Sequence, residues 1–529
     1  MSVVTLFESL SNELIIEIFE YFNGYEICKS FSNLNSHFQQ LINSSFVLFK
    51  FYSNDFIADN QLLLNHKHQL ISLQYDASLS SYSIDSSFNH LESLIINNIS
   101  SIKLLSNLSS LPRLYSLTID TQSRFDDLTQ LYQLVFTLPK LKYFKCISEI
   151  RTFCYLPSII NDKQLSNIEY LYCDHTCTIN ELSTIIPCLP KLRSLSFCNS
   201  NHDDDDDNNN VIKKIQSNIT HLYIHEDPIT LNNLKLLINE NLEVLSLDFA
   251  YEDIEYFDAY LWESFISKYL PKLEKIYFTF DTYYGNDYEP PILYNGIPNK
   301  FNSSFWIQRK WILEIRIIFD SIYYSINPYK KRWYENENDY SKLVHLIIED
   351  DDPVKPFTIN QYLNHILNLT QIFHLEIQEI ISLNKLSQIL LLLPDLQTLH
   401  LDSISFLNLD DISDEEFVHF IALIKKNQIK KLFLEKRIGI DAFELLFTIF
   451  PHLNYLQINC RDYQYTQFLL KYLLKHQNNN LIRLFCFSIP FADDKMMNKL
   501  KNLIIQNSTS NFTIQRVSDH IHVNIIENY

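Results

Sequence analysis

LPRLYSLTI, residues 111–119, is one copy of a pattern that returns along the chain. Its last positions alternate between apolar and other residues, which is typical of a β-strand with one buried face. The proline at its second position ends a preceding helix and favours the extended backbone that opens a strand. Related stretches begin at Leu138, Leu189, Leu270, Leu393 and Phe450.

The core of this pattern is three slots, Leu-x-x-Leu-x-Leu, that accept any aliphatic or aromatic residue or cysteine. Copies begin at residues 70, 91, 114, 141, 168, 192, 219, 242, 273, 312, 343, 372, 396, 429, 453 and 481. Their mean spacing of about 27 residues lies in the range of leucine-rich repeats. Helices are predicted between strands at 126–136, 232–238, 382–392, 415–425 and 468–476.

A strand followed by a helix cannot bury its apolar side alone, so each unit must stack on its neighbours. The sequence therefore predicts an α/β fold, a solenoid with a parallel sheet on its concave side and helices on its convex side. This order resembles the leucine-rich-repeat proteins. The array is expected to span residues 46–529, and a helix at 493–505 with strands at 511–517 and 520–526 is expected to cap its end.

Residues 1–45 are predicted to form three short helices instead. Their apolar positions are Leu14, Ile15, Ile18, Phe19, Phe22, Ile27, Cys28, Phe31, Leu34, Phe38, Leu41 and Ile42. Ser11 is expected to cap the first helix, and Asn23-Gly24 is expected to end it with a left-handed glycine. Helices this short cannot bury all of these side chains among themselves, which leaves apolar surface for a partner.

The order of these residues resembles the F-box, by which substrate receptors dock on the Skp-type adaptor of cullin-based ubiquitin ligases. The family's Leu-Pro-x-Glu appears as Leu10-Ser11-Asn12-Glu13, its acidic-Leu pair as Glu26-Ile27, and its later Val and Trp as Leu34 and Phe38. Serine and phenylalanine thus replace the family's proline and tryptophan. The resemblance implies that the adaptor-binding residues are Leu10, Glu13, Leu14, Ile18, Phe19, Ile27, Leu34 and Phe38.

Composition narrows the classes of partner. The formal net charge is −20, which argues against nucleic acid or an anionic membrane surface as the main partner. The first ten residues do not resemble a secretion signal, and nine cysteines in 529 residues suit a reducing compartment. We expect a cytoplasmic or nuclear protein whose partners are proteins.

The sequence offers little for catalysis or metal binding. Its four glycines are too dispersed for a phosphate-binding loop, so an enzyme with its own active site is the weaker hypothesis. Zinc is the alternative raised by Cys173-Asp174-His175-Thr176-Cys177, with Cys188 and Cys198 downstream. Cys173 falls in a core slot, where cysteine behaves as a small hydrophobe, and the paired CxxC pattern is lacking. We therefore expect no metal, no cofactor and no catalytic residues.

Residues between the slots should point to the inner, solvent-facing side of the sheet. Aromatic residues and histidines gather there in three copies, and such residues often anchor protein partners. The predicted target-binding residues are Tyr143, Tyr170, Tyr172, His221, Tyr223 and His225. The alternative is that a chain with 32 tyrosines places them everywhere. His345, His374 and His400 are expected at similar places later in the chain.

Together these patterns predict a non-catalytic substrate receptor of a cullin-based ubiquitin ligase. Residues 1–45 would bind the Skp-type adaptor, and the repeats would bind a protein target. The alternative is a leucine-rich-repeat scaffold that binds proteins without any link to ubiquitin. The two hypotheses differ in the partner that they assign to residues 1–45.

Overall fold

The computed structural model describes most of the chain in separate segments. These are residues 10–44, 48–51, 65–78, 84–99, 101–121, 125, 128–148, 165–200, 215, 217–250, 258–283, 301, 303–318, 321–329, 345–349, 372–405, 427–436, 440–460, 463–475, 484–488, 494–507, 511–517 and 520–526. They form two compact units, Met1–Phe249 with Phe265–Glu274 and Ala250–Ser264 with Lys275–Tyr529. This division lies inside the expected array 46–529, and the boundary near residue 45 stays a prediction.

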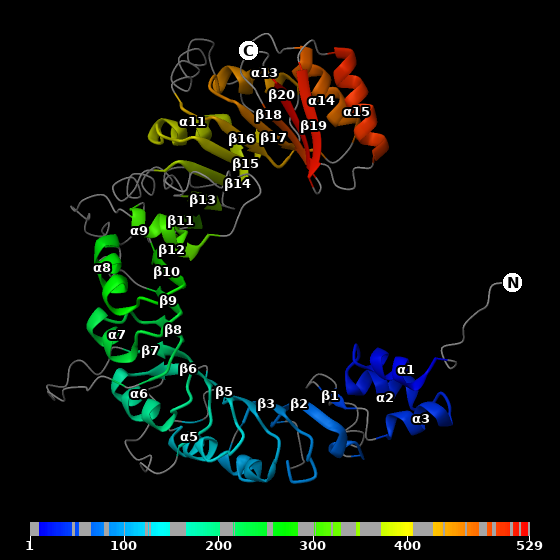
Figure 1. The fold of residues 1–529 in the computed structure, drawn as a ribbon, viewed down its shortest axis with the longest axis vertical. Coiled ribbons are helices and arrows are strands. Elements are labelled where there is room, and N and C mark those ends of the chain that lie inside the picture. Colours follow the sequence, from blue (N-terminus) through cyan, green and yellow to red (C-terminus); the bar gives the residue numbers. More distant parts are fainter. Residues whose placement is uncertain are drawn as a thin grey trace. The chain divides into compact units, whose positions relative to one another are not determined.

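The first unit contains a parallel sheet whose strands follow each other in chain order (Figure 1). The strands are β1 (Phe49–Phe51), β2 (Leu70–Asp76), β3 (Ser93–Asn97), β4 (Ser116–Asp120), β5 (Tyr143–Ile147), β6 (Tyr170–Cys177), β7 (Ser194–Asn199), β8 (His221–Glu226) and β9 (Val244–Ala250). The connections carry η3 (Lys67–Gln69), η4 (Ile102–Leu105), η5 (Leu108–Ser110), α5 (Thr129–Phe136), α6 (Ile179–Ile185), η6 (Ile186–Cys188) and α7 (Leu231–Leu237).

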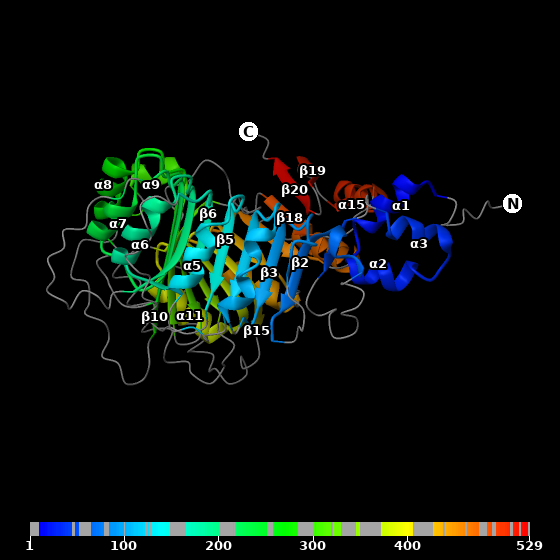
Figure 2. The same cartoon turned by 90° about the horizontal axis from the view of Figure 1, so that it is seen from below.

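The core of this unit lies between the strands and the helices α5, α6 and α7, which stand along one side of the sheet (Figures 1 and 2). One register row of the core consists of Leu73, Leu94, Leu117, Phe144, Leu171, Leu195, Leu222 and Leu245, all fully buried. On α5, Tyr132 packs against Phe144 with ring centroids 5.6 Å apart. The burial of alternate strand residues therefore fixes which face of the sheet remains for function.

The second unit is also α/β and mostly parallel, with two antiparallel exceptions. Its strands are β10 (Lys275–Tyr283), β11 (Trp311–Ile318), β12 (Ser321–Pro328), β13 (His345–Glu349), β14 (His374–Ser382), β15 (Thr398–Ser405), β16 (Lys431–Leu434), β17 (Tyr455–Asn459), β18 (Leu484–Ser488), β19 (Asn511–Val517) and β20 (His520–Ile526). Its helices include α9 (Ser304–Arg309), α11 (Leu383–Leu392), α13 (Ile440–Ile449), α14 (Tyr463–Lys475) and α15 (Asp494–Asn507), and α8 (Ala259–Tyr269) precedes β10. β12 pairs antiparallel with both β10 and β11, and β20 pairs antiparallel with β18 and β19.

The predicted strand positions are confirmed, because every one of the sixteen predicted copies contains a strand. The helix predicted at 493–505 and the strands predicted at 511–517 and 520–526 are also present as α15, β19 and β20. The helix predicted at 415–425 lies outside the described residues. β1 and β12 were not predicted, although Phe46, Phe49 and Phe51, and likewise Phe319, Ile322 and Tyr324, fit the three-slot frame. In β12 an alternation of buried Ile322, Tyr324 and Ile326 was the available signal.

Three helices precede the sheet: α1 (Asn12–Phe19), α2 (Gly24–Phe31) and α3 (Ser36–Ile42). The expected side-chain cap by Ser11 is not formed. The expectation of a left-handed Gly24 is wrong, since Gly24 is the first residue of α2. Asn23 and Glu26 instead form a capping box that starts this helix, with Asn23 Oδ1 accepting from the Glu26 amide at 2.8 Å.

The helical segment is attached to the sheet by close backbone packing and a buried amide. A Cβ atom on Gly24 would lie 2.9 Å from the Cβ of Phe49 and would overlap the ring of Phe51. Gln69 is 1% exposed and its Nε2 donates to the carbonyls of Ile42 and Ser44, each at 2.8 Å. Glycine at 24 thus permits α2 to lie directly on β1.

We predict that Gly24→Ala destabilises the first unit by about 1–3 kcal/mol, because the added methyl group overpacks the contact with β1. Inside an unconstrained helix the same change would stabilise by up to about 1 kcal/mol. The sign of the change in the free energy of denaturant unfolding decides between these cases. The exposed Ser30→Ala in the same helix is the matched control, and a stabilised Gly24→Ala would contradict the packing of α2 on β1.

Candidate functional site

The three N-terminal helices enclose a small core of their own. Its most buried members, none more than 3% exposed, are Ile15, Phe19, Ile27, Cys28, Phe38 and Ile42. The ring of Phe31 lies between two of them, with centroids 5.1 Å from Phe19 and 5.6 Å from Phe38. The segment therefore has an internal core before any partner is considered.

Large apolar side chains nevertheless remain exposed on this segment. Leu14 is 48% exposed, Tyr21 82%, Phe22 42% and Leu34 57%. Phe22 and Leu34 both adjoin Phe31: the Phe22 ring lies 6.3 Å away, and the Leu34 amide donates to the Phe31 carbonyl at 3.3 Å. Four exposed large apolar side chains on so short a segment favour a protein-binding surface.

The eight residues predicted to bind an adaptor separate into two sets. Glu13, Leu14 and Leu34 are exposed, and Leu10 and Ile18 are half-buried. Phe19, Ile27 and Phe38 are buried in the core of the segment, and their part in adaptor binding stays a prediction. The physical reason for this burial is that three helices of seven or eight residues need their own aromatic and aliphatic side chains to hold together. Adaptor binding by the accessible five stays a prediction.

The predicted target-binding residues share the open face of the first sheet. Tyr170 is exposed, and Tyr143, Tyr172, His221, Tyr223 and His225 are half-buried. Their strand neighbours on the opposite face, such as Phe144, Leu171 and Leu222, are fully buried. The predicted assignment of these strand residues to the open and the buried face is therefore confirmed. The role of the open face in binding stays a prediction.

Register places these open-face residues in rows across β5 to β8. Tyr143 pairs with Tyr170, and one row further Lys145, Tyr172, Ser196 and Tyr223 follow each other on successive strands. The small side chain of Ser196 therefore lies between Tyr172 and Tyr223 in this row. The rings of Tyr143 and Tyr172 lie 5.2 Å apart, and burial followed by the proximity of Tyr172 raises the pKa of Tyr143.

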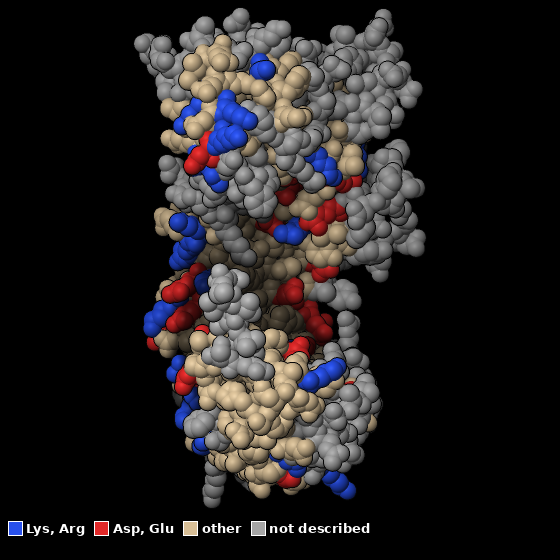
Figure 3. Space-filling view, turned by 90° about the vertical axis from the view of Figure 1, so that its right-hand side faces the viewer, with Lys and Arg blue, Asp and Glu red and all other residues tan. Residues whose placement is uncertain are grey.

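Ion pairs border these rows. Lys145 Nζ lies 3.6 Å from Asp174 Oδ2, and His225 Nδ1 lies 3.8 Å from Asp248 Oδ2. Both basic and acidic side chains are exposed among the described residues on the side that Figure 3 draws. A face that mixes aromatic rings with both signs of charge has the composition of a protein-binding surface.

The buried face of β6 differs from that of its neighbours. Cys173, His175 and Cys177 are all buried, whereas only Cys173 was assigned to the core from the sequence. Hydrogen bonding by Cys177 lowers the pKa of Cys173 to about 5 although burial opposes this shift, and hydrogen bonding by Cys173 raises the pKa of His175 against its own burial. None of the eight described cysteines forms a disulfide bond, and Cys154 lies outside the described residues.

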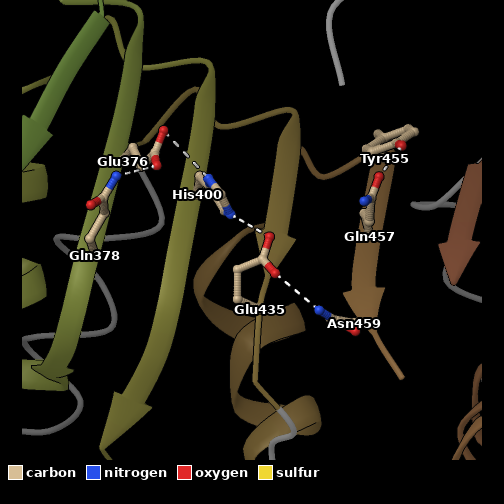
Figure 4. Close-up of polar contacts among 7 residues, drawn as sticks. All are labelled: Glu376, Gln378, His400, Glu435, Tyr455, Gln457 and Asn459. Carbon is tan, nitrogen blue, oxygen red and sulfur yellow. Dashed lines mark hydrogen bonds and ion pairs between the residues drawn. The ribbon is translucent and has the colours of Figure 1, made fainter. Parts of the chain in front are cut away.

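The second unit carries His345, His374 and His400 on the strands β13, β14 and β15, and His345 is buried rather than open to solvent. His345 and His374 are register partners with stacked rings 4.7 Å apart. His400 lies between two carboxylates: its Nε2 is 2.9 Å from Glu435 Oε1, and its Nδ1 is 3.6 Å from Glu376 Oε2 (Figure 4). Asn459 extends the chain of contacts by donating from Nδ2 to Glu435 Oε2 at 3.1 Å.

This arrangement favours the charged imidazolium of His400. Burial acts to lower its pKa, but hydrogen bonds and charge attraction from Glu376 and Glu435 outweigh burial and raise the pKa to about 9. The same contact with His400 lowers the pKa of Glu435. The carboxylates were missed in the sequence because they lie 24 and 35 residues from His400, and only register brings them together.

Comparison with known proteins gives no family for this chain. No family model matches it, and no curated protein matches it. Among the residues that the structure describes, no helix combines the length and apolarity needed to cross a lipid bilayer. Function is therefore inferred from the described geometry.

We predict that His400 stabilises the second unit in a pH-dependent way. A histidine whose pKa rises from about 6.5 in the unfolded chain to about 9 on folding gives its full stabilisation below pH ~6.5 and loses it as the pH rises through 9. His400→Gln should therefore destabilise at pH 6, by at most about 3 kcal/mol, and cost much less at pH 10. Thermal unfolding of both proteins across this range measures the difference. Exposed His37→Gln is the control, and a pH-independent cost of His400→Gln would contradict the ion pairs.

Proposed function

We propose that this chain is the substrate receptor of a cullin-based ubiquitin ligase, with the N-terminal helices as its adaptor-binding segment. The observation that carries the proposal is the set of exposed Leu14, Phe22 and Leu34 on a segment that already has a buried core. The core of the segment is filled, so these three side chains are not exposed because of a gap in its packing. A protein partner that covers these side chains would bury an apolar patch that water otherwise contacts.

The order of elements supports the same proposal. Three short helices come directly before a long α/β array, as in the F-box proteins with leucine-rich repeats that the sequence resembles. We propose that the strands and helices of the array form a leucine-rich-repeat solenoid. Gln69 and Gly24 hold the helices on β1 and β2, so an adaptor bound to the helices would be held close to the sheet.

The target is proposed to bind the open face of the first sheet, across β5, β6 and β8. Tyrosine rings there lie on a rigid strand, so little conformational entropy is lost when a partner orders them. The net charge of −20 and the mixed local charges favour a protein over a nucleic acid. The chain itself performs no chemistry in this proposal and holds a target lysine near a conjugating enzyme.

A cytoplasmic or nuclear location follows from the proposal. The described cysteines form no disulfide bond, which is compatible with a reducing compartment. The second candidate function is a repeat scaffold without a ubiquitin link. The burial of Phe19, Ile27 and Phe38 favours it, because these side chains are withheld from an adaptor in the present conformation.

We predict that Leu14→Ala with Leu34→Ala abolishes capture of a purified Skp-type adaptor by the full-length chain. Each leucine would contribute about 1.5–3 kcal/mol if the interface buries it fully. Titration calorimetry with the adaptor measures the loss, expected at a hundredfold or more.

The matched control is Leu104→Ala on η4, which removes an exposed leucine of similar accessibility far from the helices in sequence. It should leave adaptor binding unchanged. A wild-type chain that does not bind the adaptor, or a double variant that binds it as well as the wild type, would favour the scaffold.

We predict that Tyr172→Ala with Tyr223→Ala removes target proteins from the set captured in cells while leaving adaptor capture intact. Both rings stand on the open face in one register row, so their loss removes contact area without opening the core. Quantitative mass spectrometry of the captured proteins provides the measurement.

Tyr115→Ala, at an exposed tyrosine that precedes β4, controls for the loss of any surface ring. The melting temperature of the double variant should stay within a few degrees of the wild type. An unchanged set of captured proteins would place the target-binding surface elsewhere.

A further inference from the structure

The polar cluster on the buried face of β6 is compact enough to hold a metal ion. One ligand atom each from Cys173, His175 and Cys177 lies within 4.8 Å of the other two, and all three side chains are buried. In a regular strand, side chains two residues apart are separated by about 6.6 Å, and the first and third members would lie about 13 Å apart. Convergence of the three ligand atoms therefore requires a departure from regular geometry.

The departure is visible in the pairing with β7. Tyr170 to Cys173 pair with Ser194 to Phe197, but the next pair is Thr176 with Cys198. Asp174 and His175 are thus additional residues on β6, and such bulges are common where a strand re-aims side chains at a site. The bulge occurs between the two cysteines, where it shortens the path from one thiol to the other.

Packing alone gives no reason for these residue types. Cys146 and Phe197 are the register partners of Cys173 on the two adjacent strands. Ile224 and Leu247 continue this row on β8 and β9, and all four side chains are buried. A buried imidazole costs free energy unless its nitrogens are hydrogen-bonded, and an aliphatic residue at 175 would avoid that cost. The structure bonds both nitrogens, Nε2 with the Tyr132 hydroxyl at 2.6 Å and Nδ1 with the Thr176 carbonyl at 3.1 Å.

We propose that Cys173, His175 and Cys177 bind one zinc ion through two thiolates and the imidazole Nδ1. Cys177 Sγ already lies 3.5 Å from His175 Nδ1. Tetrahedral zinc with Zn–S of about 2.3 Å and Zn–N of about 2.05 Å requires ~3.6 Å between these two atoms. Soft thiolate ligands select zinc over calcium or magnesium, which prefer oxygen.

Tyr132 supplies the outer contact of this site. Zinc at Nδ1 displaces the bond to the Thr176 carbonyl and places the ring proton on Nε2, which then donates to the Tyr132 hydroxyl. In most protein zinc sites the histidine nitrogen that does not bind the metal makes a hydrogen bond of this kind, which orients the ring. Tyr132 belongs to α5, so the ion would tie that helix to β6.

Cys146 on β5 is the fourth ligand in this proposal, and because its Sγ lies outside the group of ligand atoms within 4.8 Å of one another, its side chain has to move toward them on binding. It is the direct register partner of Cys173 and points to the same buried face, and adjacent strands are about 4.8 Å apart. Three cysteines and one histidine make a closed set of the kind that structural zinc prefers. Zinc binds thiolates and a neutral imidazole, and protons compete for these groups, so zinc affinity should fall at lower pH.

The ion would fix the strand that presents the open face. β6 carries Tyr170, Tyr172 and Asp174 on one side and the cluster on the other. Zinc would therefore hold α5, β5 and β6 in one arrangement beneath these residues. This inference does not depend on any link to ubiquitin.

Metal content of the full-length chain tests the inference. Protein purified without a metal-affinity step and analysed by mass spectrometry of its elements should contain one zinc ion per chain. After removal of zinc with a chelator, titration with Co²⁺ should produce the thiolate charge-transfer bands of a tetrahedral site. Cys173→Ser with Cys177→Ser should retain less than a tenth of the zinc, and Cys146→Ser should weaken binding at least tenfold.

Cys198→Ser is the matched control, because this thiol lies on β7 with its Sγ 4.0 Å from Asp174 Oδ1, among the residues of the other face. It should retain one zinc ion. Tyr132→Phe removes only a hydroxyl and should weaken zinc binding about tenfold to hundredfold, with the affinity read from the zinc-dependent rise in melting temperature. A wild-type chain that takes up neither zinc nor cobalt, or a double cysteine variant that keeps its zinc, would overturn the proposal.

Discussion

Burial of alternate strand residues is the interaction on which the rest of this structure depends. In the first unit one continuous row, from Leu73 to Leu245, is fully buried across successive parallel strands. A shift of one residue in any strand would turn its leucines to water and its polar residues to the core. The register is therefore strongly specified, and with it the identity of every residue on the open face.

This constraint explains why the open face is free to carry function. The residues between the buried positions have no part in the core, so Tyr172 and Tyr223 in one unit and His400 in the other are placed without loss of packing. His400 acquires its two carboxylates because adjacent parallel strands place residues from distant sequence side by side. The sheet thus assembles polar groups whose sequence spacing gives no sign of their proximity.

Much of the fold was predictable because strand positions depend on a local pattern. The sixteen predicted strand positions, the open-face phase at Tyr143 and Tyr172, and the terminal elements β19 and β20 needed only alternation and spacing. The role of Gly24 was not predictable in this way, because it is set by the distance to Phe49. The alternation of β12 was visible in the sequence, but its antiparallel pairing with β10 and β11 was not.

The candidate sites were predictable only in part for the same reason. Leu14 and Leu34 were correctly expected to offer apolar surface, whereas Phe38 is buried because the helices must first satisfy one another. The burial of His175 continues the alternation of β6 past the three slots, whereas the convergence of its ligand atoms with those of Cys173 and Cys177 accompanies a bulge against β7 that no spacing rule contains. Residue types can be read from the sequence, but the distances between residues that the fold brings together cannot.

The central claim is that the exposed apolar side chains of the N-terminal helices receive a ligase adaptor. The most direct measurement is purification of the full chain from its own cells, with absolute quantification of every co-purifying protein. Our account predicts a Skp-type adaptor near one copy per chain together with a cullin. Abundant protein partners with neither adaptor nor cullin among them would contradict it.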